Sequence, residues 1–430
     1  MLREKAFQSY NFVHRFTAQM ILCILLCVPA ITHAQNKPVR FEHCSVRQGL
    51  SQGSGYSITQ DKYGFIWMGT QYGLNRFDGY QVKTFFHGDK GYTGSNHINS
   101  LYTDSNGNVW VASTSGLSIL ESSTRKFTTA SRFLKDQTGL DQLNVTKLWG
   151  DQRHHVWALS ASNTVFQIKP SSTGWLTTAF RLPARPVDIT EDGKGTIWLA
   201  TEHDIFQFDG SRRLFVKRPI PQLSGYVISA LVVDKEDRLW VGTFDNGIYL
   251  ISLHGKNEKT PIRLVEGKDE GSISSNAVTC LLKDNQNDIW IGTRTGGLNK
   301  YQNGKIIQNR HGDDVAESLA KDFVLSLFED RQGNIWVGLS GEGFDKHDPS
   351  KFQFQSIRHS QHDPSTIGDN MIFAIRRLVP GYLHFGTQLS GLSVLDESSG
   401  KFVNFKKDLS GANSIIHNTV YDLAYDGKGL

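Results

Sequence analysis

Two pairs of histidines are spaced closely enough to hold a metal ion together, His154-His155 and His359-x-x-His362. Neither pair has carboxylate partners at suitable spacing for a metal site. The sequence also has no His-x-x-x-His or Cys-x-x-Cys motif, no nucleophile elbow and no phosphate-binding loop. We therefore expect no metal, no cofactor and no catalytic residue within these 430 residues.

A second set of residues has the chemistry to bind a ligand rather than to react with one. Aromatic rings such as Tyr72 and Phe244 can stack on sugar rings, while Arg294 can hydrogen-bond hydroxyl or acidic groups. These residues lie in a sequence repeat and differ from one copy to the next, whereas the residues on either side of them are the same in most copies. Ligand-binding residues are commonly found at such variable loop positions. The candidates are Tyr72, His203, Asp204, Phe244, Asp245, Arg294 and Glu342. Ordinary surface variation is the alternative for each one, and Asp204 stands where other copies have Gly73 and Gly116, so it could serve only a turn.

The candidates lie just after copies of a sequence motif that recurs along the chain, Asp-x-x-Gly-x-Ile-Trp-x-Gly-Thr. Its tryptophan returns every 41 to 50 residues and is replaced by His384 in the eighth copy, while a ninth copy is incomplete. A period in the forties with apolar strands and Asp/Gly turns predicts the four-stranded blades of a β-propeller. The repeated tryptophans are Trp67, Trp110, Trp157, Trp198, Trp240, Trp290 and Trp336.

Each repeated residue has an expected structural role. The Asp six residues before the Trp should accept backbone N–H bonds in a turn. The Gly three residues after the Asp should have a positive φ, and Asn287, Asp237 or His154 replaces it in three copies. The Trp should pack against the neighbouring blade, and the Gly-Thr after it should let strands approach closely. Because a catalytic residue is needed only once, repetition favours structural roles for all of them.

The N-terminal segment has the pattern of a cleaved secretory signal peptide. A basic start is followed by the apolar run Met20 to Pro29 and by Thr32-His33-Ala34, which predicts removal of residues 1–34. An uncleaved anchor is the alternative. Removal takes away three basic residues and one acid, so the formal net charge falls from +4 to +2. A nearly neutral exported chain lacks the basic surface that nucleic-acid binding requires. Cys44 and Cys280 then remain, and we expect two buried, unpaired thiols on separate strands. A disulfide between them in an oxidising compartment is the alternative.

The repeat resembles that of the two-component regulator propeller family. Asp61 to Asp78 fits its pattern at every position, and the copies at Asp104, Asp284 and Asp330 fit nearly as well. The resemblance implies the periplasmic sensor region of a hybrid histidine kinase of the Bacteroidetes type. It further implies a small-molecule or oligosaccharide ligand, a dimer in the full-length protein, and membrane attachment and kinase modules in a C-terminal part that this sequence lacks. A secreted lyase-like propeller enzyme and an extracellular interaction scaffold are the alternatives.

Ring closure and domain limits follow from the repeat. Residues 39–44 resemble the fourth strands of other copies, so they can supply the outer strand of the last blade and remove an open sheet edge. We expect a first propeller of seven blades over residues 35–350 and one and a half blades of a truncated second propeller over residues 351–430. A single ring of eight blades is the alternative.

Overall fold

The computed structural model describes residues 39–89, 94–134, 139–172, 174–253, 261–313, 315, 317–350, 357–408 and 414–424. The predicted signal peptide, with Cys23 and Cys27, lies outside these residues, as does the incomplete ninth repeat. The chain divides into two compact units between Pro349 and Ser350. No helix in the described ranges has the length and apolarity needed to cross a membrane.

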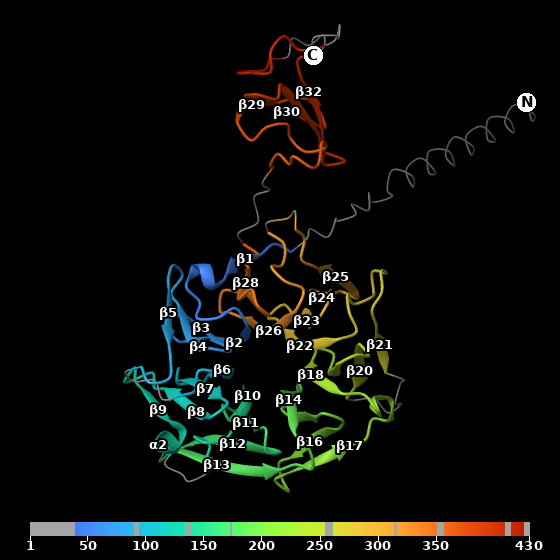
Figure 1. The fold of residues 1–430 in the computed structure, drawn as a ribbon. Coiled ribbons are helices and arrows are strands. Elements are labelled where there is room, and N and C mark those ends of the chain that lie inside the picture. Colours follow the sequence, from blue (N-terminus) through green and yellow to red (C-terminus); the bar gives the residue numbers. More distant parts are fainter. Residues whose placement is uncertain are drawn as a thin grey trace, which may run out of the picture. The chain divides into compact units, whose positions relative to one another are not determined.

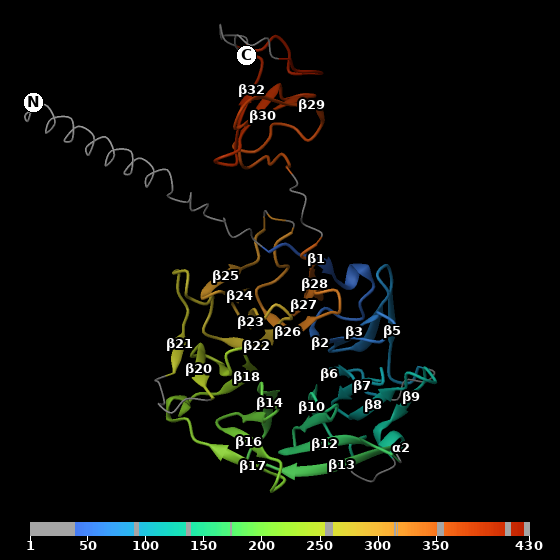
Figure 2. The same ribbon diagram turned by 180° about the vertical axis from the view of Figure 1, so that it is seen from behind.

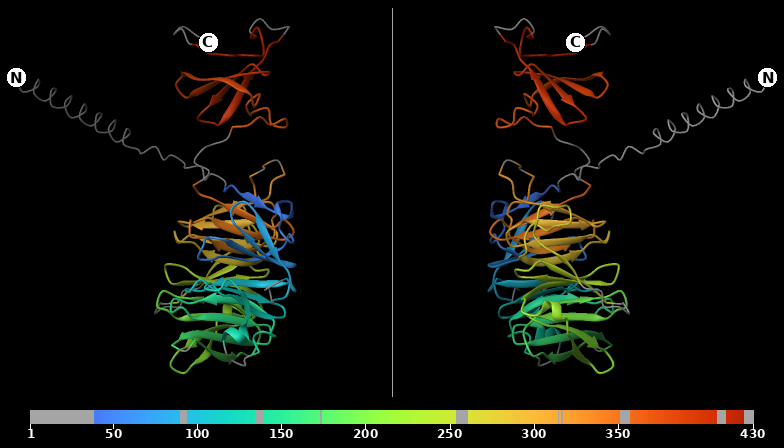
Figure 3. Two further views of the ribbon diagram at one scale, coloured as in Figure 1. Left: turned by 90° about the vertical axis from the view of Figure 1, so that its left-hand side faces the viewer. Right: turned by 90° about the vertical axis from the view of Figure 1, so that its right-hand side faces the viewer.

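The first unit contains seven antiparallel sheets of four strands, arranged as the blades of a ring (Figure 1). The innermost strands contact one another in succession from β2 to β26, and β26 contacts β2 again, which closes the ring. Figure 2 shows the same ring from behind and Figure 3 from its sides. The prediction of an all-β propeller with a seven-bladed ring is confirmed.

The strands of the ring, sheet by sheet from the innermost outward, have the following bounds. The first three sheets are β2 Gly55–Gln60, β3 Ile66–Thr70, β4 Gly73–Phe77 and β5 Val82–Phe85; β6 Ile98–Thr103, β7 Val109–Ser113, β8 Gly116–Leu120 and β9 Phe127–Thr129; and β10 Val145–Gly150, β11 Val156–Ser160, β12 Thr164–Ser171 and β13 Gly174–Arg181. The next three are β14 Pro186–Glu191, β15 Ile197–Thr201, β16 Ile205–Asp209 and β17 Leu214–Arg218; β18 Ile228–Val233, β19 Arg238–Thr243, β20 Ile248–Ser252 and β21 Ile262–Leu264; and β22 Val278–Lys283, β23 Ile289–Thr293, β24 Leu298–Gln302 and β25 Lys305–Asn309.

The seventh sheet joins the two ends of the ring. It consists of β26 Val324–Glu329, β27 Ile335–Leu339, β28 Phe344–His347 and the N-terminal strand β1 Glu42–Cys44. Strand β1 pairs antiparallel with β28, with His43 opposite Asp345. Nδ1 of His43 lies 2.6 Å from Oδ1 of Asp345, whose side chain is fully buried. A segment far away in the sequence thus covers the edge that β28 would otherwise expose.

The second unit contains one further sheet of the same kind. Its strands are β29 Ile372–Val379, β30 Tyr382–Thr387, β31 Leu392–Asp396 and β32 Lys401–Phe405. The described helical segments are short: α2 Ala130–Leu134 and the 3-10 segments η1 Val46–Gln48 and η2 Pro221–Leu223.

The turn between the first two strands forms as the repeat predicts. In the sixth sheet, Oδ1 of Asp284 accepts the backbone N–H groups of Gln286 and Asp288, at 3.0 and 2.8 Å. Asn287 lies in the left-handed region at φ 66°, as do Asp237 and His154 in their sheets. The glycines at this place also have positive φ, from 79° to 97°. The predicted roles of the Asp and the Gly are therefore confirmed.

The core consists of seven clusters between neighbouring sheets of the ring. Trp290 is 2% exposed and belongs to one cluster with Val324 and Ile335 of the next sheet. In four of the seven sheets a Gly stands two residues after the Trp, and it leaves no room for a side chain: a Cβ on Gly292 would lie 2.7 Å from Cγ1 of Val324. The predicted roles of the Trp and of this Gly, in packing adjacent blades closely, are confirmed.

Candidate functional site

The seven sequence candidates all lie in turns between the second and third strands of their sheets. Because the strands are antiparallel, these turns open on the same face of the ring as the connections from one sheet to the next. We call this surface the loop face. Tyr72 follows β3, His203 and Asp204 follow β15, Phe244 and Asp245 follow β19, Arg294 follows β23, and Glu342 follows β27.

The structure brings two of the candidates together, Phe244 and Arg294. The guanidinium carbon of Arg294 lies 5.6 Å from the ring centroid of Phe244 and 5.5 Å from that of Phe323. Three consecutive sheets therefore supply a cation held between two aromatic rings. Arg294 has no ion pair with the described residues, and Phe244 is 49% exposed. This arrangement offers guanidinium donors and an aromatic surface to a ligand on the loop face.

Phe323 was missed by the sequence reasoning. It stands immediately before an innermost strand, where the corresponding residues of the two preceding sheets are Val227 and Ala277. Comparison of the copies at this position would have shown an unrepeated aromatic residue. The candidates were instead taken from the turns between the second and third strands alone.

The remaining candidates are distributed around the ring. Tyr72 is 58% exposed and its ring centroid lies 5.7 Å from that of Phe86. Oδ1 of Asp204 makes an ion pair of 2.7 Å with Nζ of Lys217. The backbone of Asp204 does not have the positive φ of Gly73 and Gly116, so this turn does not require a glycine there.

Three candidates remain, His203, Asp245 and Glu342, and each has its own surroundings. His203 is exposed, and its Nδ1 lies 3.2 Å from the carbonyl oxygen of Tyr226. Asp245 is exposed in the turn after β19. Burial raises the pKa of Asp345, and the negative charge of Glu342 raises it further. Asp245 lies next to Phe244 in the same turn, while His203 and Glu342 lie in the turns of other sheets.

The central channel contains a further polar feature that the sequence did not indicate. A cavity of about 440 Å³ is lined by the innermost strands β10, β14, β18 and β22. Lys147 and Asp188 form an ion pair there, and Oδ2 of Asp188 also accepts the backbone N–H of Leu231 at 2.9 Å. Asp188 is 3% exposed, and a buried carboxylate requires a counter-ion and hydrogen-bond donors. Lys147 and the backbone N–H of Leu231 meet these two requirements. The pair bridges adjacent sheets and therefore has a structural role in the ring.

The two histidine pairs lie in separate local contacts. Nδ1 of His155 lies 2.8 Å from Oδ2 of Asp151, and Nδ1 of His359 lies 2.8 Å from the carbonyl oxygen of Ile367. In the described part of the chain, no three His, Cys, Asp or Glu side chains gather as a metal site would require. Cys44 and Cys280 are unpaired thiols on β1 and β22.

Comparison with known families identifies the repeats. The profile of the family described as two component regulator propeller matches residues 94–115, 222–245, 272–295 and 318–341. A curated histidine kinase, P4 of Formosa agariphila, is 46% identical over 52 residues, which are 12% of this chain and 4% of that protein.

Comparison with solved structures gives the same architecture. The extracellular domain of a putative hybrid two component system from B. thetaiotaomicron is similar over 91% of this chain and 51% of its own, with a TM-score of 0.68 and 22% identity. The extracellular domain of a putative one component system from that organism has a TM-score of 0.58 and 18% identity over the same shares. Virginiamycin B lyase from Staphylococcus aureus has a TM-score of 0.55 and 14% identity over 71% of this chain and 98% of its own. At these identities the likeness establishes the fold.

Proposed function

Because this chain carries two component regulator propeller repeats, we propose that it is the extracytoplasmic sensing region of a two-component signalling protein. In this role it binds an external cue on the loop face and relays binding to kinase modules of a longer protein. The observation that carries the proposal is the combination of matched repeats with a fold shared, over 91% of the chain, with the extracellular domain of a hybrid two component system.

The relay is a proposal about a longer protein. This chain spans 51% of the first similar structure and 4% of the histidine kinase relative. We propose export to the periplasm, attachment to the inner membrane through a later segment, and dimerisation of the full-length protein. The coding sequence after codon 430 tests the relay directly. A membrane-spanning segment followed by a kinase module would support it, and a stop codon after one more domain would contradict it.

The cue that we propose is an oligosaccharide. Arg294 between Phe244 and Phe323 combines hydrogen-bond donors with exposed aromatic surface, and these are the groups that recognise hydroxyls and the apolar faces of sugar rings. A lyase activity is the other function consistent with the fold, since virginiamycin B lyase has a similar ring. We favour binding because Arg294 and its two aromatic neighbours are recognition groups rather than an acid–base pair.

Calorimetric titration against a panel of oligosaccharides tests the cue. We expect one class to bind and the Arg294→Ala variant to weaken its binding at least tenfold, which corresponds to about 1.4 kcal/mol. The Arg213→Ala variant is the matched control, because Arg213 lies in a turn between third and fourth strands, on the opposite face. Equal affinity of both variants, or no binding across the panel, would contradict the oligosaccharide proposal and leave the fold unaffected.

A further inference from the structure

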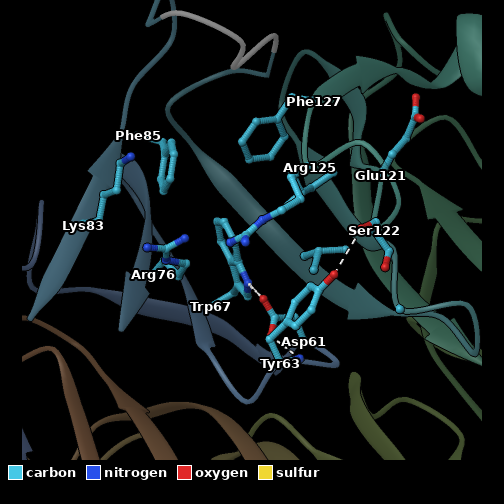
Figure 4. Close-up of a pocket in the computed structure, with 13 residues that line it drawn as sticks. Asp61, Tyr63, Trp67, Arg76, Lys83, Phe85, Glu121, Ser122, Arg125 and Phe127 are labelled. Atoms are coloured by element: carbon cyan, nitrogen blue, oxygen red, sulfur yellow. Dashed lines mark hydrogen bonds between the residues drawn. The ribbon is translucent and has the colours of Figure 1, made fainter. Parts of the chain in front are cut away.

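A pocket between the first two sheets of the ring lies on the face opposite the loop face. Its volume is about 230 Å³, and it is bounded by the turns that follow β2, β6 and β8 (Figure 4). Aromatic rings form much of its wall, with Trp67 and Phe85 5.5 Å apart and Phe127 5.7 Å from Phe85. Tyr63, which is 55% exposed, lies beside Asp61 (Figure 4). The pocket can therefore accept a planar or apolar ring.

Three cationic side chains, Arg76, Lys83 and Arg125, also line the pocket. The guanidinium carbon of Arg76 lies 4.4 Å from the Phe65 ring centroid, and that of Arg125 lies 5.2 Å from the Tyr63 ring centroid. Within the described ranges, none of the three cations has an ion pair. The pocket thus has an excess of positive charge.

The nearby carboxylates are engaged elsewhere. Asp61 accepts bonds from the Trp67 indole and from two backbone N–H groups of its own turn, and Glu121 accepts a bond from Thr124. Neither acid makes an ion pair with the three cations, so the lining has one more positive than negative side chain, and Asp78 interacts with Arg76 through its charge.

Two buried polar atoms of this pocket lack a hydrogen-bond partner, Nε of Arg76 and Oγ of Ser122. Ser122 is 8% exposed, so water has little access to its hydroxyl group. A buried donor without an acceptor costs free energy of folding, which a bound acceptor would recover.

The sixth sheet of the ring shows what is missing in the first. Arg76 stands opposite Trp67 on the neighbouring strand, and Lys300 stands opposite Trp290 in the same way. Lys300 has a carboxylate partner, since its Nζ lies 2.8 Å from Oδ2 of Asp288. The residue two before the Trp is Asp288 in that sheet and Phe65 in the first. The first sheet therefore keeps the cation and replaces its carboxylate with an aromatic ring.

The backbone of Arg125 adds an independent observation. Its φ is 56°, a left-handed conformation that costs a non-glycine residue about 1–2 kcal/mol. The corresponding turn of the second unit has Gly400 at φ 70°, and that of the fourth sheet has Arg213 at φ 55°. Arg213 donates to Oγ1 of Thr178 at 3.2 Å, whereas Arg125 faces Tyr63.

We propose that this pocket binds a small organic acid whose carboxylate is attached to a ring. The carboxylate pairs with Arg76 and Arg125, while the ring packs against Phe85 and Phe127. An acidic sugar and an aromatic acid share this chemistry. The site is separate from the loop face, and its existence does not depend on the proposed signalling role.

The test is calorimetric titration of the full chain with two acids and their neutral counterparts. The acids are methyl β-D-glucuronide and 4-hydroxybenzoate, and the counterparts are methyl β-D-glucoside and 4-hydroxybenzyl alcohol. We expect at least one acid to bind with at least about tenfold higher affinity than its counterpart, and added salt to weaken that binding. The acid that binds identifies the source. Binding by neither acid, or equal binding of an acid and its neutral counterpart, would overturn the proposal.

Two variants separate binding from folding. Arg125→Gly removes the cation and relieves the left-handed strain, so it should weaken the acid at least about tenfold without lowering Tm. Arg213→Gly makes the same change in the equivalent turn of the fourth sheet, outside the pocket, and should leave the affinity unchanged. Arg76→Gln should weaken binding as Arg125→Gly does. Equal affinities of the wild type and Arg125→Gly, or equal losses in Arg125→Gly and Arg213→Gly, would overturn the assignment.

Discussion

The indole nitrogen of Trp290 donates a hydrogen bond of 2.8 Å to Oδ2 of Asp284. The other oxygen of this carboxylate holds the turn, so one Asp joins the turn to the tryptophan between the blades. The same bond occurs in all seven sheets of the ring, with lengths from 2.7 to 3.0 Å. The fixed interval of six residues between Asp and Trp is therefore a geometric requirement of this bond.

Replacement of Asp284 by Ala should lower the free energy of unfolding by about 2–4 kcal/mol. It leaves a buried indole N–H and two turn N–H groups without their acceptor. The measurement is urea denaturation, with Asp245→Ala as the control because Asp245 is exposed. The double variant Asp284→Ala/Trp290→Phe should lose less stability than the sum of the losses of the two single variants, because the shared bond can be removed only once. Additive losses would contradict the coupling.

The sequence of the second unit also indicates that the Asp and the Trp of the repeat depend on each other. Its repeat has lost both partners, with Leu378 in place of the Asp and His384 in place of the Trp. His384 is 1% exposed, and its Nδ1 is buried without a hydrogen-bond partner. Without the Asp, the five-residue turn of the ring is replaced by a two-residue turn, in which Gly381 has φ 83° and Val379 pairs with Tyr382. Once either the Asp or the Trp is replaced, the hydrogen bond between them is lost, and the other residue is no longer needed for it.

The local features were predictable from the sequence because each depends on a few consecutive residues. The positive φ of Asn287 and the blade limits follow from turn chemistry and from the apolar strands. The Asp–Trp bond was missed, although the constant spacing was the available evidence for it. The contact of Arg294 with Phe323 depends on how adjacent blades pack, and the pocket of Arg76 and Arg125 depends on two sheets together. No local pattern specifies such contacts.

Two glycines of the seventh sheet should respond differently to replacement by Ala. A Cβ on Gly338 would lie 2.2 Å from the backbone oxygen of Gly55, so Gly338→Ala requires the backbone of an adjacent sheet to move. We expect it to lower the free energy of unfolding by about 3 kcal/mol or more. Gly341 has open space and φ 94°, so Gly341→Ala should cost only the conformational strain of about 1–2 kcal/mol. Chemical denaturation measures both, and equal losses would contradict the close approach between sheets.

The contact of His43 with Asp345 should stabilise the closed ring. Oδ2 of Asp345 accepts the backbone N–H of Ala320 at 2.7 Å, so His43→Ala would leave a buried carboxylate with one of its partners missing. We expect a loss of about 1–3 kcal/mol at neutral pH. Burial raises the pKa of Asp345 and His43 opposes that shift, so the variant should have a still higher pKa.

The pH dependence of this variant follows from that shift. Protonation removes the unpaired charge, so the loss should shrink as the pH falls through the raised pKa toward the unfolded value. Thermal unfolding across acidic and neutral pH measures this trend. The exposed His203→Ala is the control, and a loss independent of pH would contradict the role of the buried carboxylate.

The two strand cysteines should be poor nucleophiles while the ring is folded. Burial raises the pKa of Cys44 to about 11 and that of Cys280 to about 12, from 9.0. Since the thiolate is the reactive form, disulfide reagents at pH 8 should react roughly 100-fold more slowly with Cys44 than with an ordinary thiol, and more slowly still with Cys280. The measurement uses a chain with Cys23→Ser and Cys27→Ser, before and after unfolding in urea.

The same shifts make stability depend on pH in the alkaline range. A folded-state pKa above the unfolded value contributes stability that is present below pH 9 and is lost as the pH rises toward about 11 for Cys44 and about 12 for Cys280. The free energy of unfolding should therefore fall above pH 9, and Cys44→Ser should remove part of that fall. Rapid reaction of both thiols in the folded chain at pH 8 would contradict the burial on which both expectations rest.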